Sequence, residues 1–359
     1  MSDERAESAA KQGRLNTVDI VKGIAIVLMV FGHTEQGAMH RHWWDAMPRF
    51  VKGLSFTDSF IYSFHMPAFF FISGLFLAGS LTRRGQLGFS MEKARTILYP
   101  YILWGLIESL SDPLTARFRS GAHLFSWHRI FMDLASGDAS WFLISLFVCQ
   151  LLAVLVFRLP HWVQMALALA GCYLMPVSPL IVLYKPFLFF PFVVAGIWVG
   201  SRRLSMIEDL PRSTAWLAFG ALLAIQLAVI GLWGEVTRWT MTPIGLAGTV
   251  MLILLSRGLH GTLWDKMFRW LGEGSLGIFL ISPFCQGFGR EIVLRVLHST
   301  MPLPQLLVPI VLATAIPALL WHYQDGLHIG WLFRWPWPGK QGREREVAVN
   351  TSEPDSRYT

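Results

Sequence analysis

Long apolar runs separated by short polar segments are the main pattern along this chain. A helix needs about 20 mostly apolar residues to span a bilayer. The pattern therefore predicts an all-α polytopic membrane protein with about ten transmembrane helices. A transmembrane β-barrel is excluded, because it would show short alternating segments instead. The predicted spans are 17–36, 56–79, 97–111, 140–158, 161–177, 181–200, 213–234, 239–257, 273–294 and 304–323.

The composition supports a membrane protein. Of the 359 residues, 53% are hydrophobic and only 15% are charged, whereas an average soluble domain is about 25% charged. A soluble protein with so little charge could not cover its own surface. Intrinsically disordered and disulfide-stapled classes are excluded as well. The three cysteines lie in apolar runs without CxxC spacing, so we expect buried thiols and no metal site.

The net charge of +7 is explained by membrane topology. Lys and Arg collect in cytoplasmic loops, and every second loop is basic if the N-terminus is cytoplasmic. The loop 112–139 on the opposite side is also basic but carries compensating aspartates. We expect both termini in the cytoplasm, contact with membrane lipids, and no nucleic-acid partner. The basic residues on the predicted cytoplasmic side are Arg83, Arg84, Lys93, Arg95, Arg158, Arg202, Arg203, Arg257, Lys266, Arg269, Arg334, Lys340, Arg343 and Arg345.

Polar ends flank one predicted transmembrane domain. Residues 1–14 are polar and of mixed charge, so we expect a cytoplasmic tail before an uncleaved first helix. Residues 15–335 form the transmembrane domain, and the polar residues 336–359 are expected to be disordered. The sequence shows no clear internal repeat, which weakens the interpretation as an inverted-repeat transporter.

The first predicted span contains three ionisable residues, which are costly in a bilayer and are therefore site candidates. Lys22 and His33 are eleven positions apart, so their directions around the helix differ by about 20°. Asp19 falls on the same stripe and is expected to pair with Lys22. His33 lies about 16 Å further along the helix. Structural alternatives remain open: Lys22 as a snorkelling lysine, Asp19 as only its partner, and His33 as a structural histidine.

The second predicted span carries another histidine, His65. If the first two spans are antiparallel, His33 and His65 both lie about 20–24 Å above the cytoplasmic face. Pro67 is expected to kink the helix beside His65, and irregular backbone at this depth is tolerated where it lines a cavity. The alternative role for His65 is a hydrogen bond to a neighbouring helix.

Two further features allow a structural and a functional interpretation. The basic run after the second span contains Arg83, Arg84, Lys93 and Arg95. It is either a topology signal or a clamp for an anionic ligand such as a nucleotide phosphate. Trp141 opens the fourth span and is either an interfacial belt residue or a residue on the acceptor side of a site. P-loop, GxGxxG, HExxH and GxSxG motifs are absent from the sequence.

Four stretches, in this order, resemble the membrane-bound acyltransferase-3 family, which includes O-acetyltransferases of bacterial polysaccharides. The family has an arginine in its first helix, eleven residues before a histidine. Here Lys22 occupies the arginine position and His33 the histidine position. A lysine at this place resembles the fucose 4-O-acetylase-like branch of the family. The late family motif usually ends in His-Pro, but here it ends in Ser282 and Pro283, so we transfer no role to that position. The matching stretches are TVDIVKGIAIVLMVFGH (17–33), SFHMPAFFFISG (63–74), ASWFLISLFVCQLL (139–152) and WLGEGSLGIFLISP (270–283).

The resemblance implies transfer of an acetyl group to a sugar hydroxyl. The donor would be cytoplasmic acetyl-CoA, used as a substrate without a permanently bound cofactor. The acceptor would be an exported or envelope carbohydrate such as an exopolysaccharide, O-antigen or glucan, and the location the bacterial inner membrane. Lys22 and the basic run would hold the CoA phosphates. Asp19, His33 and His65 are the catalytic candidates, with His33 as general base or acyl acceptor and His65 orienting it or polarising the carbonyl.

Two other classes of function stay open at the level of sequence. A secondary transporter would move a polar or anionic solute past the Asp19, Lys22 and His33 side chains. A non-catalytic membrane sensor or scaffold would use the basic tail but leaves the histidines inside the spans unexplained. Self-association into a homo-oligomer is compatible with each of these classes.

Overall fold

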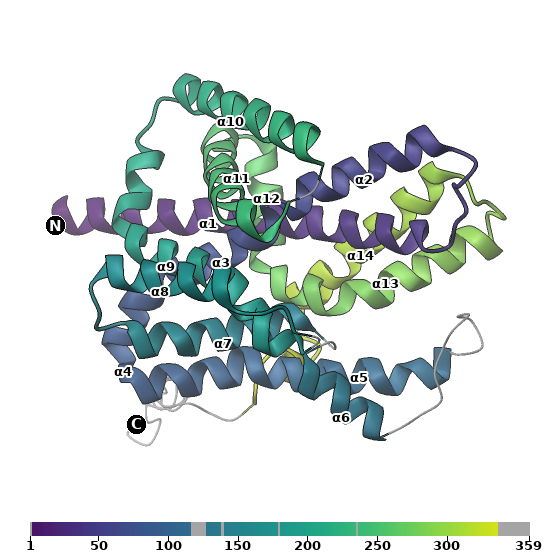
Figure 1. The fold of residues 1–359 in the computed structure, drawn as a ribbon, viewed down its shortest axis with the longest axis horizontal. Helices are drawn as coiled ribbons and strands as arrows, with labels where there is room; N and C mark the ends of the chain where they lie inside the picture. The colour runs from purple at the N-terminus through teal and green to yellow at the C-terminus, as the bar shows by residue number, and fades with distance from the viewer. Residues whose placement is uncertain (1, 116–126, 138–139, 179, 235, 337–359) are drawn as a thin grey trace, which may run out of the picture.

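The computed structural model describes residues 2–115, 127–137, 140–178, 180–234 and 236–336. Within these ranges the secondary structure is helical, without strands (Figure 1), which confirms the all-α fold class. The predicted disordered tail, apart from residue 336, lies outside the described residues. The elements are α1 Ser2–Met39, α2 Pro48–Tyr62, α3 His65–Leu75, α4 Leu77–Lys93, η1 Ala94–Leu98, α5 Tyr99–Thr115, α6 Trp127–Ser136, α7 Trp141–Val156, α8 His161–Leu174, α9 Ile181–Glu208, α10 Arg212–Trp233, α11 Arg238–Leu259, α12 Leu263–Glu273, α13 Ser275–Arg295, α14 Pro302–His322 and η2 Gly330–Leu332.

Fewer helices than expected have the length and composition to span a bilayer. Five qualify in the described residues, and a sixth is reached if the pair Pro48–Leu75 and Leu77–Ser111, bent by 63°, is one span. α7 and α8 have 16 and 14 residues, short of the roughly 20 needed to cross the hydrocarbon core. α13 is long enough but is charged in its second half. The multi-pass character is therefore supported, while the count of ten and the cytoplasmic termini stay predictions.

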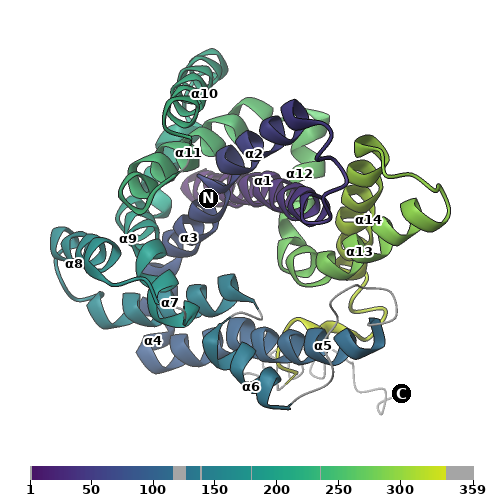
Figure 2. The ribbon, with the colours of Figure 1, turned by 45° about the vertical axis from the view of Figure 1, so that its right-hand side comes forward.

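Helix α1 lies in the interior of the bundle. Figures 1 and 2 show it among α2, α3 and α12, with α13 and α14 to one side, and it also contacts α9 and α11. Its apolar residues Ile20, Ala25 and Val30 are fully buried. Residues 2–14, expected as a tail, continue α1 as helix. The fold thus surrounds the helix that carries Asp19, Lys22 and His33.

Glycines set the close contact between α1 and α12. A Cβ atom on Gly23 would collide with the carbonyl oxygen of Phe268, and one on Gly272 with the carbonyl oxygen of Asp19. Small residues at such crossings allow two backbones to approach each other. This close packing places α12 directly beside Asp19.

We expect the Gly272→Ala substitution to destabilise the protein by about 1–3 kcal/mol, because the added methyl group overpacks a backbone contact. The measurement is the thermal unfolding midpoint of the purified protein in detergent. Gly79→Ala is the matched control, since a Cβ at Gly79 in α4 meets nothing within 4 Å. Equal midpoints for Gly272→Ala and wild type would contradict this contact.

The second predicted span is broken directly before His65. α2 ends at Tyr62, Phe64 has φ −140° and ψ −24°, and α3 begins at His65. The sequence predicted a continuous helix kinked at Pro67. Instead, Pro67 occupies the first turn of a new helix, where its missing N–H has no intrahelical role. The break gives His65 and Tyr62 backbone positions that a continuous helix would not provide.

Candidate active site

Five residues of α1 lie on one face of the helix at spacings of three or four positions, and Arg41, two residues beyond the end of α1, continues the same spacing. Because the α-helix has 3.6 residues per turn, this spacing forms a stripe along it. The first three residues of the stripe line one cavity and the last three line another. We call these the Lys22 cavity and the His33 cavity. The stripe consists of Lys22, Ile26, Met29, His33, Gly37 and Arg41.

The Lys22 cavity has a volume of about 230 Å³ and lies between α1, α3, η1, α7 and α13. Its walls are mostly apolar, with hydroxyl groups from Ser73, Thr96 and Ser275. Lys22 Nζ lies 2.7 Å from Asp19 Oδ1, so the expected ion pair is present. An ammonium group at the edge of an apolar cavity suits a ligand with an anionic head and an apolar tail.

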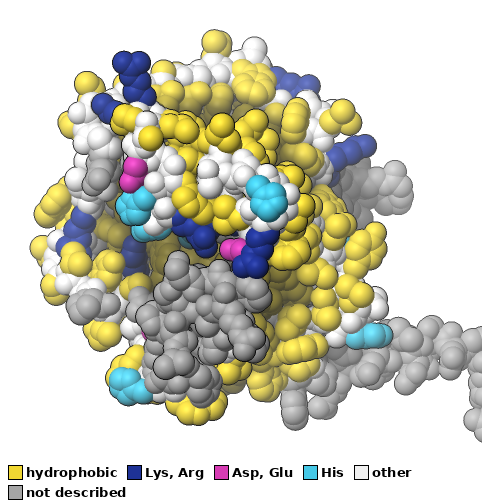
Figure 3. Space-filling model, turned by 90° about the vertical axis from the view of Figure 1, so that its right-hand side faces the viewer, with side chains coloured by type: hydrophobic (Ala, Val, Ile, Leu, Met, Phe, Trp, Pro, Cys, Tyr) yellow, Lys and Arg dark blue, Asp and Glu magenta, His cyan; other side chains and the backbone are white. Residues whose placement is uncertain are grey.

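The His33 cavity is larger, at about 600 Å³, and lies between α1, α5 and α13. Figure 3 looks onto the face toward which the C-terminal end of α1 points, where charged and histidine side chains gather around a hollow. Cavities of this size accommodate small polar molecules. The polar lining residues are His33, Arg41, Glu108, Ser111, Gln286, Arg290, Glu291 and Arg295.

Ion pairs and hydrogen bonds connect α13 to α1 around the His33 cavity. Glu291 Oε2 lies 2.9 Å from Arg295 Nε, and its Oε1 lies 4.0 Å from Arg41 Nη2. Gln286 Nε2 donates to the Val30 carbonyl oxygen at 3.0 Å. Arg290 donates to the carbonyl oxygen of Thr34 at 3.4 Å. These contacts fix charged donors and acceptors on the wall beside His33.

Tyr62 links the two histidines. Its ring makes edge-on contacts with His33 (centroid distance 6.4 Å) and with His65 (4.7 Å). The fully buried His65 ring has Nδ1 2.7 Å from the Ile61 carbonyl oxygen. A carbonyl oxygen only accepts, so Nδ1 donates a proton to it and Nε2 carries the lone pair of the neutral ring. Nε2 has no hydrogen-bond partner among the described residues. The structure thus brings His33 and His65 to the same Tyr62 ring, while their similar depth in the membrane stays a prediction.

A chain of polar contacts holds Tyr62 from the other side. Gln36 Nε2 lies 3.0 and 3.2 Å from the two carboxylate oxygens of Asp58, and the Tyr62 hydroxyl lies 3.5 Å from Gln36 Oε1. Gly32 leaves room for the Tyr62 ring, since a Cβ there would lie 3.2 Å from it. This chain orients the ring that contacts both histidines.

Residues 15–322 match the family described as an acyltransferase domain. The chain belongs to the acyltransferase-3 family. The nodulation protein NolL of Sinorhizobium fredii is 34% identical over 111 residues, covering 28% of this chain and 26% of the relative. NolL of Mesorhizobium japonicum is 27% identical over 204 residues, covering 52% of this chain and 49% of the relative. The chain therefore spans about half or less of each curated relative, and no solved structure matches it.

In this acyltransferase-3 protein, the four predicted basic residues after the second span are not among the residues that line the Lys22 cavity. Arg83 Nε donates to the Gly79 carbonyl oxygen at 3.1 Å, and Arg84 lies 3.4 Å from Glu92. Lys93 Nζ lies 5.1 Å from the centre of a phenylalanine ring. Arg95 is on η1 next to Thr96, which does line the cavity. Of the predicted donor residues, the structure brings Lys22 alone into this cavity.

Trp141 lines neither cavity. Its ring stacks on Phe189 at 5.4 Å and lies 4.7 Å from Lys185 Nζ. The next residue, Phe142, lines the Lys22 cavity. The structure therefore does not bring Trp141 together with His33, and its acceptor-side role stays a prediction.

Sequence reasoning missed most of the polar lining of the His33 cavity. Glu108 and Arg290 lie inside predicted spans, so the rule that ionisable residues in a span are site candidates would have identified them. Asp58 and Tyr62 are four residues apart in α2, which places them on one helix face. Gln36 carries no comparable signal, since glutamine is neutral.

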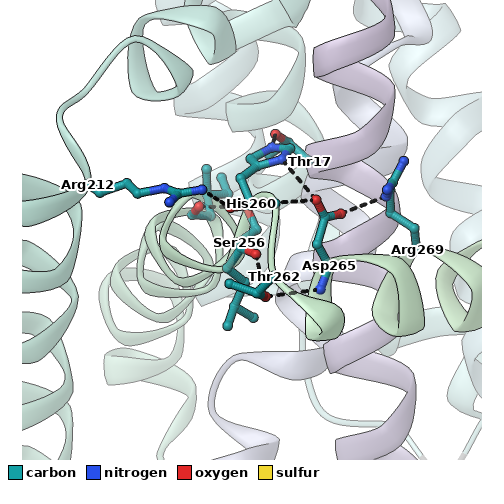
Figure 4. Close-up of polar contacts among 10 residues, drawn as sticks. Thr17, Arg212, Ser256, His260, Thr262, Asp265 and Arg269 are labelled. Carbon is teal, nitrogen blue, oxygen red and sulfur yellow. Dashed lines mark hydrogen bonds and ion pairs between the residues drawn. The ribbon is translucent and has the colours of Figure 1, made fainter.

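A separate polar cluster fixes the start of the first span to the turn between α11 and α12 (Figure 4). Thr17 Oγ1 lies 3.2 Å from His260 Nε2, and His260 Nδ1 lies 3.5 Å from Asp265 Oδ2. Arg269 Nε lies 2.6 Å from Asp265 Oδ1. Burial alone would raise the pKa of Asp265, but the Gly261 N–H hydrogen bond, Arg269 and His260 together lower the pKa below its ordinary value.

We expect Asp265→Asn to lower the thermal unfolding midpoint at neutral pH, because the charge that pairs with Arg269 is removed. The pKa of Asp265 is lower in the folded protein than in the unfolded chain, where it is about 4. The charged carboxylate therefore stabilises the fold above about pH 4, and this contribution is lost as the pH falls further. Unfolding in detergent from pH 7 down to pH 3 tests this. If the difference in unfolding midpoint between Asp265→Asn and wild type stayed unchanged down to pH 3, the lowered pKa of Asp265 would be contradicted.

Proposed function

We propose that the protein is a membrane O-acyltransferase that moves acetyl from cytoplasmic acetyl-CoA to a hydroxyl of an exported or envelope carbohydrate. The observation that carries this proposal is the α1 stripe. It places Lys22 in one cavity and His33 in the next, about 16 Å apart along the helix. Membership of the acyltransferase-3 family supports the reaction class.

The donor would enter at the Lys22 cavity. The ammonium group of Lys22 suits the negative charge of the CoA phosphates, and the apolar walls suit the arm that carries the thioester. Ser73, Thr96 and Ser275 offer hydroxyls to the amide groups of that arm. Arg83, Arg84, Lys93 and Arg95 would then attract the nucleotide from the cytoplasmic side. Acetyl-CoA is a substrate in this scheme, and no permanently bound cofactor takes part.

The acceptor would occupy the His33 cavity. Carboxylates, guanidinium groups, Ser111 and Gln286 around it can hydrogen-bond to sugar hydroxyls in both directions. The volume of about 600 Å³ suits a sugar unit of a larger glycan. A bacterial inner membrane would give the cavity access to glycans on the side opposite the CoA pool.

His33 would remove the proton from the acceptor hydroxyl while the oxygen attacks the thioester carbonyl. The C–O ester bond forms, the C–S bond breaks, and the proton passes from His33 to the departing thiolate, so that CoA leaves as a thiol. The alternative order is a transient acyl group on the imidazole followed by transfer to the hydroxyl. His65 acts through Tyr62, whose ring contacts both imidazoles. Asp19 would keep Lys22 charged and oriented.

Mass spectrometry of envelope and secreted glycans from cells with and without the gene tests this proposal. We expect acetyl groups, each adding 42 Da to a glycan fragment, to disappear from one class of glycan when the gene is removed. The same spectra would identify the sugar and the acyl group. Glycans that are identical in both strains would contradict the proposal and favour a transporter that uses the two cavities as a path.

A further inference from the structure

Two methionines lie where the two cavities meet. Met29 lies on α1 one turn before His33, and Met66 directly follows His65 on α3. Both line the Lys22 cavity, and each is only 2% exposed. Each methionine is thus next to one of the two histidines and faces the cavity proposed for the donor.

The two cavities share no lining residue, so side chains separate them. On α1 the boundary falls between Met29, the last residue of the stripe in the Lys22 cavity, and His33. On α13 it falls between Phe279 and Pro283, which are also one turn apart. Met66 directly follows His65, whose ring contacts the same Tyr62 ring as His33, so Met66 contributes from α3 to the His33 end of the Lys22 cavity. Met29, Met66 and Phe279 therefore lie between the Lys22 cavity and His33.

Methionine side chains suit a barrier that lets a small group pass by changing rotamers. Each is unbranched, has three rotatable bonds and fills irregular gaps. Interiors otherwise pack tightly and reject added volume. A pair of methionines can move aside for a small acyl group, whereas a longer acyl chain would need more space than the side chains can release.

We infer, resting on the proposed function, that Met29 and Met66 form an acyl-selecting barrier between the Lys22 cavity and His33, which restricts transfer to short acyl groups. The donor thioester reaches His33 only past these two side chains. Acyl length is therefore set by the side chains at this barrier, while the rest of the Lys22 cavity binds the part of the donor that all acyl-CoA molecules share.

The test uses detergent-permeabilised membranes from cells that express the protein, with their own glycans as acceptor. The probes are radiolabelled acetyl-CoA, butyryl-CoA and hexanoyl-CoA, and the readout is label fixed in the glycan. We expect wild type to transfer acetyl far faster than the longer groups. Met29→Ala and Met66→Ala should raise the ratio of butyryl to acetyl transfer by about tenfold or more, the range for one or more methylenes in an apolar pocket.

Ile72→Ala is the matched control. Ile72 lines the same cavity on α3 but lies six residues beyond Met66, about 9 Å along the helix. This variant enlarges the cavity away from the histidines, so its acyl preference should equal that of wild type. If Ile72→Ala raised the ratio of butyryl to acetyl transfer as much as the methionine variants do, the result would reflect cavity volume in general and would overturn the inference.

A second pair of variants covers the case in which the alanine variants fail to fold. Met29→Leu nearly conserves volume and should retain acetyl transfer, whereas Met29→Phe should reduce it about tenfold by blocking the passage. Unchanged acetyl transfer in Met29→Phe, or wild-type transfer of hexanoyl at the acetyl rate, would overturn the inference. Absence of label from every donor in wild type would instead contradict the proposed function itself.

Discussion

Replacement of His33 by alanine is expected to lower acyl transfer by about 10²–10⁴-fold, the usual contribution of a general acid–base group. His33 lines the larger cavity and is the imidazole on the stripe that continues from Lys22. The KM for acetyl-CoA should stay unchanged, because the donor is proposed to bind in the other cavity. The measurement is initial rate against donor concentration in permeabilised membranes, with radiolabelled acetyl-CoA as the probe.

His42→Ala is the matched control for this variant. His42 follows α1 by three residues, pairs with Asp45 at 3.2 Å and has a side chain that is 78% exposed. Its removal should leave the rate unchanged. The thermal midpoint of His33→Ala should remain close to that of wild type, which separates lost chemistry from lost folding. Full acylation by a folded His33→Ala protein would exclude His33 as the base and as an acyl acceptor.

The second large effect is expected from Lys22→Met, which should raise the KM for acetyl-CoA about tenfold or more while kcat changes little. A hydrogen bond to a charged group contributes about 1.5–3 kcal/mol, and Lys22 is the one cation that lines the Lys22 cavity among the described residues. Lys22→Arg keeps the charge and should retain most of the donor affinity. Initial rates across a range of acetyl-CoA concentrations measure both constants.

Loss of Lys22 also removes the ion-pair partner of Asp19, which is expected to lower the stability of the fold. The double variant Asp19→Asn with Lys22→Met removes both charges, so it should recover stability but not donor affinity. Lys52→Ala is a control for removal of an exposed lysine on α2. A double variant with the KM of wild type would show that Lys22 acts through the fold and not through the donor.

Much of the candidate site follows from the periodicity of one helix. The residues Asp19, Lys22 and His33 share a face of α1 because the angle per residue is fixed, whatever packs against it. Both the ion pair and the relation between Lys22 and His33 were therefore predictable. Counting residues in an antiparallel helix predicted His65 at the depth of His33, and the structure places both rings against Tyr62. The buried cysteines followed from the apolar runs around them.

Other features depend on contacts between segments far apart in the sequence. The break at Ser63 and Phe64 was predicted as a kink at Pro67, because sequence alone does not show where a helix stops when both sides are apolar. Hydropathy likewise gave runs that could span a bilayer but not the lengths of the helices they form. α7 and α8 have 16 and 14 residues, fewer than the predicted spans 140–158 and 161–177.

Apolar content and helical period are local properties, so the membrane class, the helical fold, the family and the shared face of Asp19, Lys22 and His33 could be predicted from the amino-acid sequence. The packing of the helices shows that the stripe passes through two cavities, that Tyr62 bridges the histidines, and that α13 supplies charges to the second cavity. It also places Met29 and Met66 in the lining of the Lys22 cavity. These relations depend on which helices pack against α1 and at what register, and no local period specifies that.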